Sequence, residues 1–506
     1  MEIELADQKV LLDDKNVLNA SVLEKYRLAG QIAQTGLVFV QTLVHENEEA
    51  ERSVGEICRL GDAFLRRATG NAFKKQNVKE RGIALPVQIE KTNFVSGVAP
   101  EEEDSFQGGR LNEGDIVKIT LGVHIDGYTA QASHTTVVRS RESDLSAPNG
   151  PQPLTGTNAD AVCAAYIASE AVICLLGLCL NPNAPLAAAS TGSVNGRMIR
   201  QLVEKIAATF RVKVCPGSRV RRVRRFLAGQ NDLVQEADYK GVDWIQEKEE
   251  QRTMARLRHS SPDGEEPSNE VAIAEDDFQV EAGEAWLVDI RMAGTQGKQG
   301  IIRFKDYYDD SGTVARAAVY SRDYGVQYGL KLSASRSLLS KSAAITSVYP
   351  FKLSYVAETP SELASSRLGL SELVHHHIFV PHSIKTAEFV PLELFANTTN
   401  PTSKEIRQAT QRVDIAREMS TVVLASGEQT TSGFPEVVRL TGGNRSAPAP
   451  WVHSAYEITD ATIRELLDMR SNKKVHGIGF QDLQPSKINM TEAIAPIVVD
   501  NTMEVD

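Results

Sequence analysis

The sequence at residues 112–130 reads NEGDIVKITLGVHIDGYTA. The runs 116–124 and 128–138 are rich in β-branched residues, and the dipeptide Asp126-Gly127 lies between them. Asp-Gly between two such runs is a strong signal for a tight hairpin turn. The stretch therefore predicts two antiparallel strands that turn at 125–127.

Helical patterns flank this hairpin. Two helices are expected before it, over 21–44 and 53–70, because each opens with a capping-box pattern and carries apolar residues at helical spacing. The capping pairs are Ser21 with Glu24 and Ser53 with Glu56. Further helices are predicted at 158–180 and 193–210, strands at 285–292 and 417–424, and a mixture of both over 320–374.

Polar stretches interrupt the pattern. Residues 247–277 are rich in Glu, Asp, Arg, Ser and Pro and contain few large apolar side chains, which predicts a mobile insertion. Smaller insertions are expected near 101–110 and 397–405. The prediction is a single domain over 1–483 that carries these loops, followed by an irregular C-terminal tail at 484–506.

Composition narrows the class of protein. The 506 residues have a net charge of -11, which argues against a uniformly basic nucleic-acid binder. A local basic face is still possible, because salt confines each charged patch to roughly 8 Å. The five cysteines form no CxxC pair, which fits a reducing compartment. The longest apolar run, 171–180, is too short to span a bilayer, so we expect a soluble intracellular protein without a membrane partner.

The segment 211–230 reads RVKVCPGSRVRRVRRFLAGQ and is densely basic. It contains no carboxylate, so its arginines are expected to have few partners within the chain. Arginine binds phosphate in a bidentate manner and stacks on bases, which predicts contact with RNA. A nuclear-import signal and pairing with the acidic insertion at 247–277 are the alternatives. The residues concerned are Arg219, Arg221, Arg222, Arg224 and Arg225.

Several segments resemble the methionine-aminopeptidase-like pita-bread family. They are KYRLAGQIAQ (25–34), KERGIALPVQI (79–89) and the hairpin stretch, and they most resemble the non-catalytic branch that includes the proliferation-associated ErbB-binding proteins. The stretches PGSRVRRVRRFLAGQN (216–231), YKGVDW (239–244) and RLTGGN (439–444) are similar to fungal factors that associate with the ribosomal export complex on large-subunit precursors. The resemblance implies an α+β fold, with a pseudo-symmetric pita-bread sheet, outer helices and acidic loop insertions.

The resemblance also implies a lost metal site. Active members of the family hold two metal ions through two Asp, one His and two Glu side chains, which generate a metal-bound hydroxide. A further His that assists catalysis in the enzymes matches Gly97. Because oxygen-rich divalent sites depend on carboxylates, we expect no metal, no other cofactor and no catalysis. The five matching ligand positions are Thr120, Gln131, Ser218, Asp289 and Met419.

Asp289 retains a carboxylate, and two expectations concern its surroundings. A buried charge is normally paired, so Asp289 is expected to be hydrogen-bonded or ion-paired in a polar cavity rather than to bind metal. Thr120 should lie diagonal to Gln131 on one face of the hairpin. Glu418, next to Met419, should point to the other face of its strand.

Weaker signals come from histidine and tryptophan. The run 375–377 is three consecutive histidines with His382 nearby, and we expect a surface or pocket-edge role rather than a metal site. His124 and His134 are expected to be hydrogen-bonded core or rim residues. Trp244, Trp286 and Trp451 are expected to be packing anchors.

The resemblance implies a non-catalytic ribosome biogenesis factor. Such a protein would bind 60S subunit precursors near the polypeptide exit tunnel, through rRNA and ribosomal proteins, and support their assembly and nuclear export. It would shuttle between nucleus and cytoplasm, with contacts to nuclear pore proteins and cytoplasmic release factors. The alternatives are a metalloaminopeptidase with a rearranged metal site and a general peptide or RNA chaperone.

Overall fold

The structure is a computed structural model. It describes residues 14–494 apart from 46–51, 74–77, 79, 102–108, 140–151, 185–192, 227–238, 260–275, 309–311, 358, 398–401, 431, 443–450 and 472–475. Most of the expected insertion at 101–110 and parts of those at 247–277 and 397–405 therefore lie outside the described residues. The same holds for the end of the basic segment and for 495–506 in the tail.

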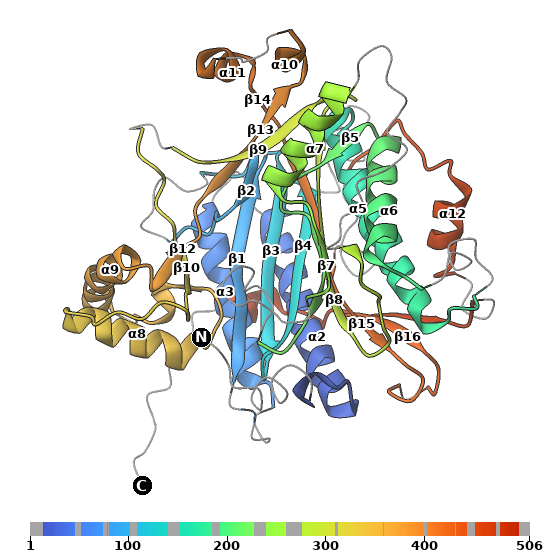
Figure 1. The fold of residues 1–506 in the computed structure, drawn as a ribbon. Coiled ribbons are helices and arrows are strands. Elements are labelled where there is room, and N and C mark those ends of the chain that lie inside the picture. The colour runs from blue at the N-terminus through green and yellow to red at the C-terminus, as the bar shows by residue number, and fades with distance from the viewer. Residues whose placement is uncertain are drawn as a thin grey trace.

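A large, mainly antiparallel sheet forms the centre of the molecule (Figure 1). Two strand pairs, β3–β4 and β15–β8, meet where Met419 lies opposite Ser133. The strand order is β1 (Arg81–Lys91), β3 (Ile116–Ile125), β4 (Tyr128–Val137), β15 (Ile415–Ala425), β8 (Ala285–Gly294), β6 (Arg219–Val223) and β7 (Gly241–Asp243). The short strands β5 (Val212–Val214), β16 (Glu436–Arg439) and β17 (Gly479–Asp482) extend it.

The predicted hairpin is confirmed as β3–β4. Ile125 pairs with Tyr128, so the turn consists of Asp126 and Gly127, with φ of 54° and 80°. Positive φ at both positions is the geometry of a type I′ turn, which matches the twist of the flanking strands. The Asp126 carboxylate also accepts a 2.6 Å hydrogen bond from Lys25 Nζ, which ties the turn to the first long helix.

Four helices cover one face of this sheet. They are α2 (Ala20–His45), α3 (Val54–Asn71), α5 (Thr157–Gly177) and α6 (Gly196–Thr209), close to the predicted ranges. Ser53 caps α3 as expected. The capping box at Ser21 is wrong: α2 begins one residue earlier, and the Asn19 side chain accepts a 3.0 Å hydrogen bond from Val22 N. Asn is as good a cap as Ser, so a cap two residues before Ser21 starts this helix equally well.

Helix α5 and the 3-10 turn that follows it, η4 (Leu178–Leu180), form the most apolar element. Together, at Thr157–Leu180, they are long and apolar enough to cross a membrane. The apolar run at 171–180 is therefore only the end of a longer apolar segment. However, 72% of the apolar window is buried inside the molecule. Its side chains share a core with Trp286 and Val288 of β8 and with Val422 of β15, which identifies α5 as a core helix.

The region 319–381 forms a small module beside the sheet (Figure 1). Its core contains Phe351, Leu373 and Phe379. A buried ion pair of 2.7 Å between Lys352 Nζ and Asp62 Oδ2 joins it to α3. The elements are β10 (Val319–Arg322), α8 (Ser333–Thr346), β11 (Phe351–Lys352), η7 (Leu353–Tyr355), α9 (Pro360–His375) and β12 (Phe379–Pro381).

The expected mobile insertion at 247–277 is in part a helix, α7 (Gln246–His259). It packs on β9 (Gly300–Asp306), a strand of a second sheet with β13 (Lys385–Pro391), β2 (Phe94–Ser96) and β14 (Gln411–Arg412). Arg303 donates two 2.9 Å hydrogen bonds to the Glu250 carboxylate. A helix held by charged contacts lacks the apolar stripe that sequence patterns detect, which explains the wrong prediction.

Two other predicted irregular segments contain helices. The region near 397–405 includes the end of α10 (Glu393–Asn397) and the start of α11 (Ser403–Ala409), where Thr402 and Glu405 form a capping box. In the tail, 484–494 runs along α2 and α3 and ends in α14 (Met490–Ile494). Ser486 N donates to Thr35 Oγ1 at 3.0 Å, so these residues belong to the folded body.

The hairpin turn gives a stability prediction with a matched control. A Cβ on Gly127 would lie 2.8 Å from the Phe226 ring, whereas a Cβ on Gly114, also at positive φ, would meet nothing within 4 Å. Gly114→Ala should therefore cost only the backbone strain of about 1–2 kcal/mol. Gly127→Ala should lose roughly 1–3 kcal/mol more through overpacking. Urea unfolding followed by circular dichroism would test this order, and equal midpoints for the two variants would contradict it.

Candidate functional site

The site lies on the sheet face opposite the helices. Thr120 pairs with Ser133, and Gln131 pairs with Gly122, so Thr120 is diagonal to Gln131 as predicted. Met419 lies opposite Asp289, and Asp289 lies opposite Arg219 on its other side. The five family ligand positions are all buried: Thr120, Gln131, Ser218, Asp289 and Met419.

Arginines surround the Asp289 carboxylate. Arg417 binds it through two hydrogen bonds, Nε to Oδ1 at 2.8 Å and Nη2 to Oδ2 at 2.9 Å. Arg291 Nη2 is 3.3 Å and Arg219 Nε is 3.5 Å from Oδ2. Burial alone would raise the pKa of Asp289, but these charges and hydrogen bonds hold it well below its usual range. Asp289 is therefore the ion-paired carboxylate that the sequence predicted.

The Arg417 guanidinium contacts three of the five ligand positions. Besides Asp289, its Nη1 donates to Thr120 Oγ1 at 3.3 Å and its Nη2 lies 3.8 Å from Met419 Sδ. This residue was missed in the sequence, although a signal existed. Arg417 lies two residues before Met419 on a strand, so both side chains must point to the same face. The positively charged Arg417 side chain thus binds Asp289, the only one of the five ligand positions that carries a carboxylate.

Two further charged groups lie on the same face at 0% exposure, Glu90 and Lys118. Burial raises the pKa of Glu90, although Arg417, whose Nη1 is 4.0 Å from Glu90 Oε2, opposes the shift. Burial lowers the pKa of Lys118 to about 8, against the opposing charge of Glu90. Among the described residues, no group of three or more His, Cys, Asp or Glu could hold a metal ion.

Ser218, at another ligand position, and Glu418, next to Met419, are both hydrogen-bonded within the protein. Ser218 Oγ accepts a 3.0 Å hydrogen bond from Arg291 N and donates to Arg291 O at 3.2 Å. Glu418 points to the opposite face as expected, where its carboxylate bonds His134 Nδ1 at 2.8 Å and accepts from Thr135 N at 3.0 Å. Neither side chain is available as a replacement ligand.

The basic segment lies within the fold rather than on a free loop. Arg219 contacts Asp289, Arg222 lies 3.4 Å from Glu284, and Arg225 Nη2 lies 2.7 Å from Asp126 Oδ1. For Arg219, Arg222 and Arg225 the expectation of few partners within the chain is wrong, because the carboxylates come from other strands and turns. Arg221 and Arg224 are only 6% and 7% exposed. Contact of these five residues with RNA stays a prediction.

The other singled-out residues are structural. His124 stacks on Tyr349 with ring centroids 4.1 Å apart, and Trp244 and Trp286 are buried as expected. Trp451 is only partly buried. The 375–377 histidines end α9 rather than lying on a strand, and the His376 ring stacks on Tyr328 at 3.5 Å. His382 is bonded to Ser321 Oγ at 2.6 Å.

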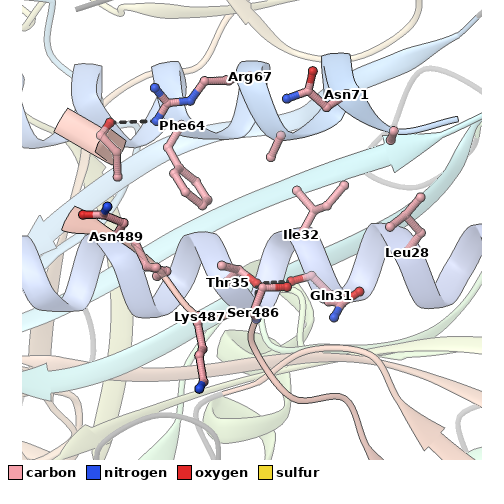
Figure 2. Close-up of a pocket in the computed structure, with 14 residues that line it drawn as sticks. Leu28, Gln31, Ile32, Thr35, Phe64, Arg67, Asn71, Ser486, Lys487 and Asn489 are labelled. Atoms are coloured by element: carbon pink, nitrogen blue, oxygen red, sulfur yellow. Dashed lines mark hydrogen bonds between the residues drawn. The ribbon is translucent and has the colours of Figure 1, made fainter. Parts of the chain in front are cut away.

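A separate hollow of about 500 Å³ lies on the helix face (Figure 2). Figure 2 shows Ile32 and Leu28 of α2 facing it from one side and Phe64 of α3 from the other. Ser486, Lys487 and Asn489 of the C-terminal segment line it as well. It lies on the opposite face of the sheet from the site described above and contains none of the five ligand positions.

The fold and site define a pita-bread protein of the aminopeptidase-like class, in which Arg417 binds Asp289 among the positions that match the family's metal ligands. No family model matches the chain. Over 503 residues it is 48% identical to the probable metalloprotease ARX1 of Yarrowia lipolytica, covering 97% of this chain and 99% of that protein. The chain belongs to the Arx1 family.

Two further comparisons agree. A thermophilic Arx1 structure superposes with a TM-score of 0.59 at 18% identity, covering 88% of this chain and 98% of that one, which shows the same fold. The ErbB-3 binding protein 1 of Solanum tuberosum is 25% identical over 370 residues, covering 73% of this chain and 76% of that protein. The predicted relationship to the ErbB-binding proteins is confirmed.

The Arg417–Asp289 pair predicts a large coupling energy. Replacing one member, as in Arg417→Met or Asp289→Leu, leaves a buried charge without its bidentate partner and should cost about 3–5 kcal/mol. The double variant should be closer to the native protein than the sum of the single losses, because neither charge then remains. A double-mutant cycle in urea measures this, and strictly additive losses would rule out the pairing.

The buried imidazole of His124 predicts a response to acid. Burial lowers its pKa to about 3, whereas an unfolded histidine titrates near about 6.5. The unfolded chain therefore binds a proton first, and stability present at neutral pH is lost as the pH falls below about 6.5. His124→Phe keeps the ring against Tyr349 and should reduce the drop in thermal midpoint between neutral and mildly acidic buffer. An unchanged drop would refute this origin.

Proposed function

We propose that this protein is a non-catalytic ribosome biogenesis factor. In this proposal it binds precursors of the 60S subunit near the polypeptide exit tunnel, through rRNA and ribosomal proteins, and supports their assembly and nuclear export. It shuttles between nucleus and cytoplasm and meets nuclear pore proteins and cytoplasmic release factors on the way. Membership of the Arx1 family and the sequence resemblance to factors of the ribosomal export complex support this assignment.

One observation carries the non-catalytic part. A dinuclear metal site needs several carboxylates converging on the same space. Here that space holds the Arg417 guanidinium, bonded to Asp289 and Thr120, with Arg291 and Arg219 close by. Two divalent cations beside three guanidinium groups would be repelled strongly at low dielectric. The name of the relatives, probable metalloprotease, describes a chemistry for which this arrangement is unsuited.

The structure changes how RNA contact by the basic segment can be tested. Reversing Arg222 or Arg225 to Glu would break ion pairs to Glu284 or Asp126 and would disturb the fold itself. A useful variant must remove the cation without leaving its carboxylate alone. The Arg225–Asp126 pair allows this, because Asn tolerates the left-handed backbone that Asp126 adopts in the turn.

Metal content tests the absence of catalysis. Purified protein incubated with excess Co²⁺, Mn²⁺ or Zn²⁺ and then dialysed should retain almost no divalent metal, measured by mass spectrometry, and should cleave no peptide. The Arg417→Ala/Arg291→Ala variant is the control, because it lacks two of the guanidinium groups that lie beside Asp289. Close to two tightly held ions per native chain, with peptide cleavage lost in Asp289→Ala, would overturn the proposal.

Co-sedimentation with large-subunit precursors tests the ribosomal part. The native protein should sediment with these particles, and binding should weaken steeply with salt because phosphate contacts release counterions. If Arg225 contacts RNA, Asp126→Asn/Arg225→Gln should bind several-fold more weakly than Asp126→Asn alone. Equal binding of these two variants would assign Arg225 to the fold only. Failure of the native protein to co-purify with large-subunit rRNA at moderate salt would favour a general chaperone instead.

A further inference from the structure

The guanidinium of Arg221 is buried without satisfying its donors. The side chain lies on β6 and is 6% exposed. Its Nε and Nη2 are both inaccessible, and neither has a hydrogen-bond partner among the described residues. A buried donor on a charged group that lacks a partner costs more than a neutral one. Two parallel donors of one guanidinium are therefore left without an acceptor among the described residues.

Two carboxylates on the strands that flank Arg221 are engaged elsewhere. On the neighbouring strand, Asp243 faces Arg219 across β6–β7 and accepts a hydrogen bond from the Tyr239 hydroxyl. Asp289 is bound by Arg417. Arg221 itself pairs along the backbone with Gly241 and Leu287, and neither residue has a polar side chain. The chain thus supplies no anion to this guanidinium in the part that the structure describes.

The charges on this face of the sheet also favour binding of an anion. Cations exceed carboxylates by two on the inner face of β1, β3, β15, β8, β6 and β7, where alternate residues point away from the helices. Such an excess in a buried setting favours an anion. The cations are Lys118, Arg219, Arg221, Arg291 and Arg417, and the carboxylates are Glu90, Asp243 and Asp289.

The donors that lack partners have a specific geometry. Nε and Nη2 form one edge of the planar guanidinium, and this edge binds two oxygens of a carboxylate or phosphate in parallel. Tyr239 offers an approach from solvent, since it is 44% exposed. A Cβ on Gly241 would lie 2.5 Å from the Tyr239 hydroxyl and 2.9 Å from Arg221 Cβ, so the exposed phenol and the buried arginine are neighbours.

We propose that this face binds a small oxyanion, a carboxylate or phosphate group, through the Nε and Nη2 edge of Arg221. Arg219 and the excess positive charge around it add attraction. Because Arg221 is only 6% exposed, a small ion can approach it more readily than a nucleic-acid duplex can. The metal-binding face of the enzyme class has thereby become an anion-binding face. This inference does not depend on the ribosomal assignment.

Thermal unfolding of the full-length protein at constant ionic strength tests the site. Replacing chloride stepwise by inorganic phosphate or by acetate should raise the midpoint in a saturable way, because a ligand that binds only the native state stabilises it. A larger effect of phosphate identifies a phosphate source, and a larger effect of acetate identifies a carboxylate source. No saturable shift with either anion would overturn the proposal.

Two variants and one independent measurement complete the test. Arg221→Lys keeps the charge but loses the two-donor edge, and it should abolish at least nine-tenths of the shift. Arg412→Gln, which removes an exposed cation on β14, should retain it. An equal shift in Arg221→Lys and the native protein would refute the site. If Arg221→Lys does not fold, amide hydrogen exchange of 220–223 in the native protein decides: slower exchange with anion supports the site, and unchanged exchange overturns it.

Discussion

The bidentate contact between Arg417 and Asp289 is the interaction on which the interpretation of this protein depends. It joins the two strands at the centre of the sheet, β15 and β8, beside the positions that match the family's metal ligands. A guanidinium and a carboxylate buried together satisfy each other at little net gain, but either one alone would be costly. The contact therefore makes the centre of the sheet depend on both side chains being present together.

Further positive charges lie around this pair. Arg291 on β8, Arg219 on β6 and Lys118 on β3 are on the same face of the sheet as Asp289. Thr120 and Ser133 share a 2.8 Å hydrogen bond between their hydroxyls. This face of the sheet is therefore polar and carries more cations than carboxylates.

The fold was largely readable from the sequence because its main elements carry strong local signals. The Asp126-Gly127 turn and the apolar faces of α2, α3 and α6 required no tertiary information. The predicted secondary structure was wrong where charged contacts, rather than a periodic apolar face, stabilise an element. Helix α7, with its Glu250–Arg303 contact, is an example. For the site, the sequence indicated only that most of the family's metal-ligand side chains are replaced. Ion pairs of Arg219 with Asp289 and of Arg225 with Asp126 join residues far apart in the chain, so no local pattern could reveal them.

The position of β15 in the sheet has a consequence for how the chain is made. This strand, at 415–425, lies between β4 at 128–137 and β8 at 285–294. During synthesis both neighbours therefore emerge long before the strand that joins them, and their unpaired edges are open to wrong pairing. Closing the sheet requires contacts of very high sequence separation, which slows folding. A nascent chain of this protein must be protected from aggregation until nearly its whole length has been translated.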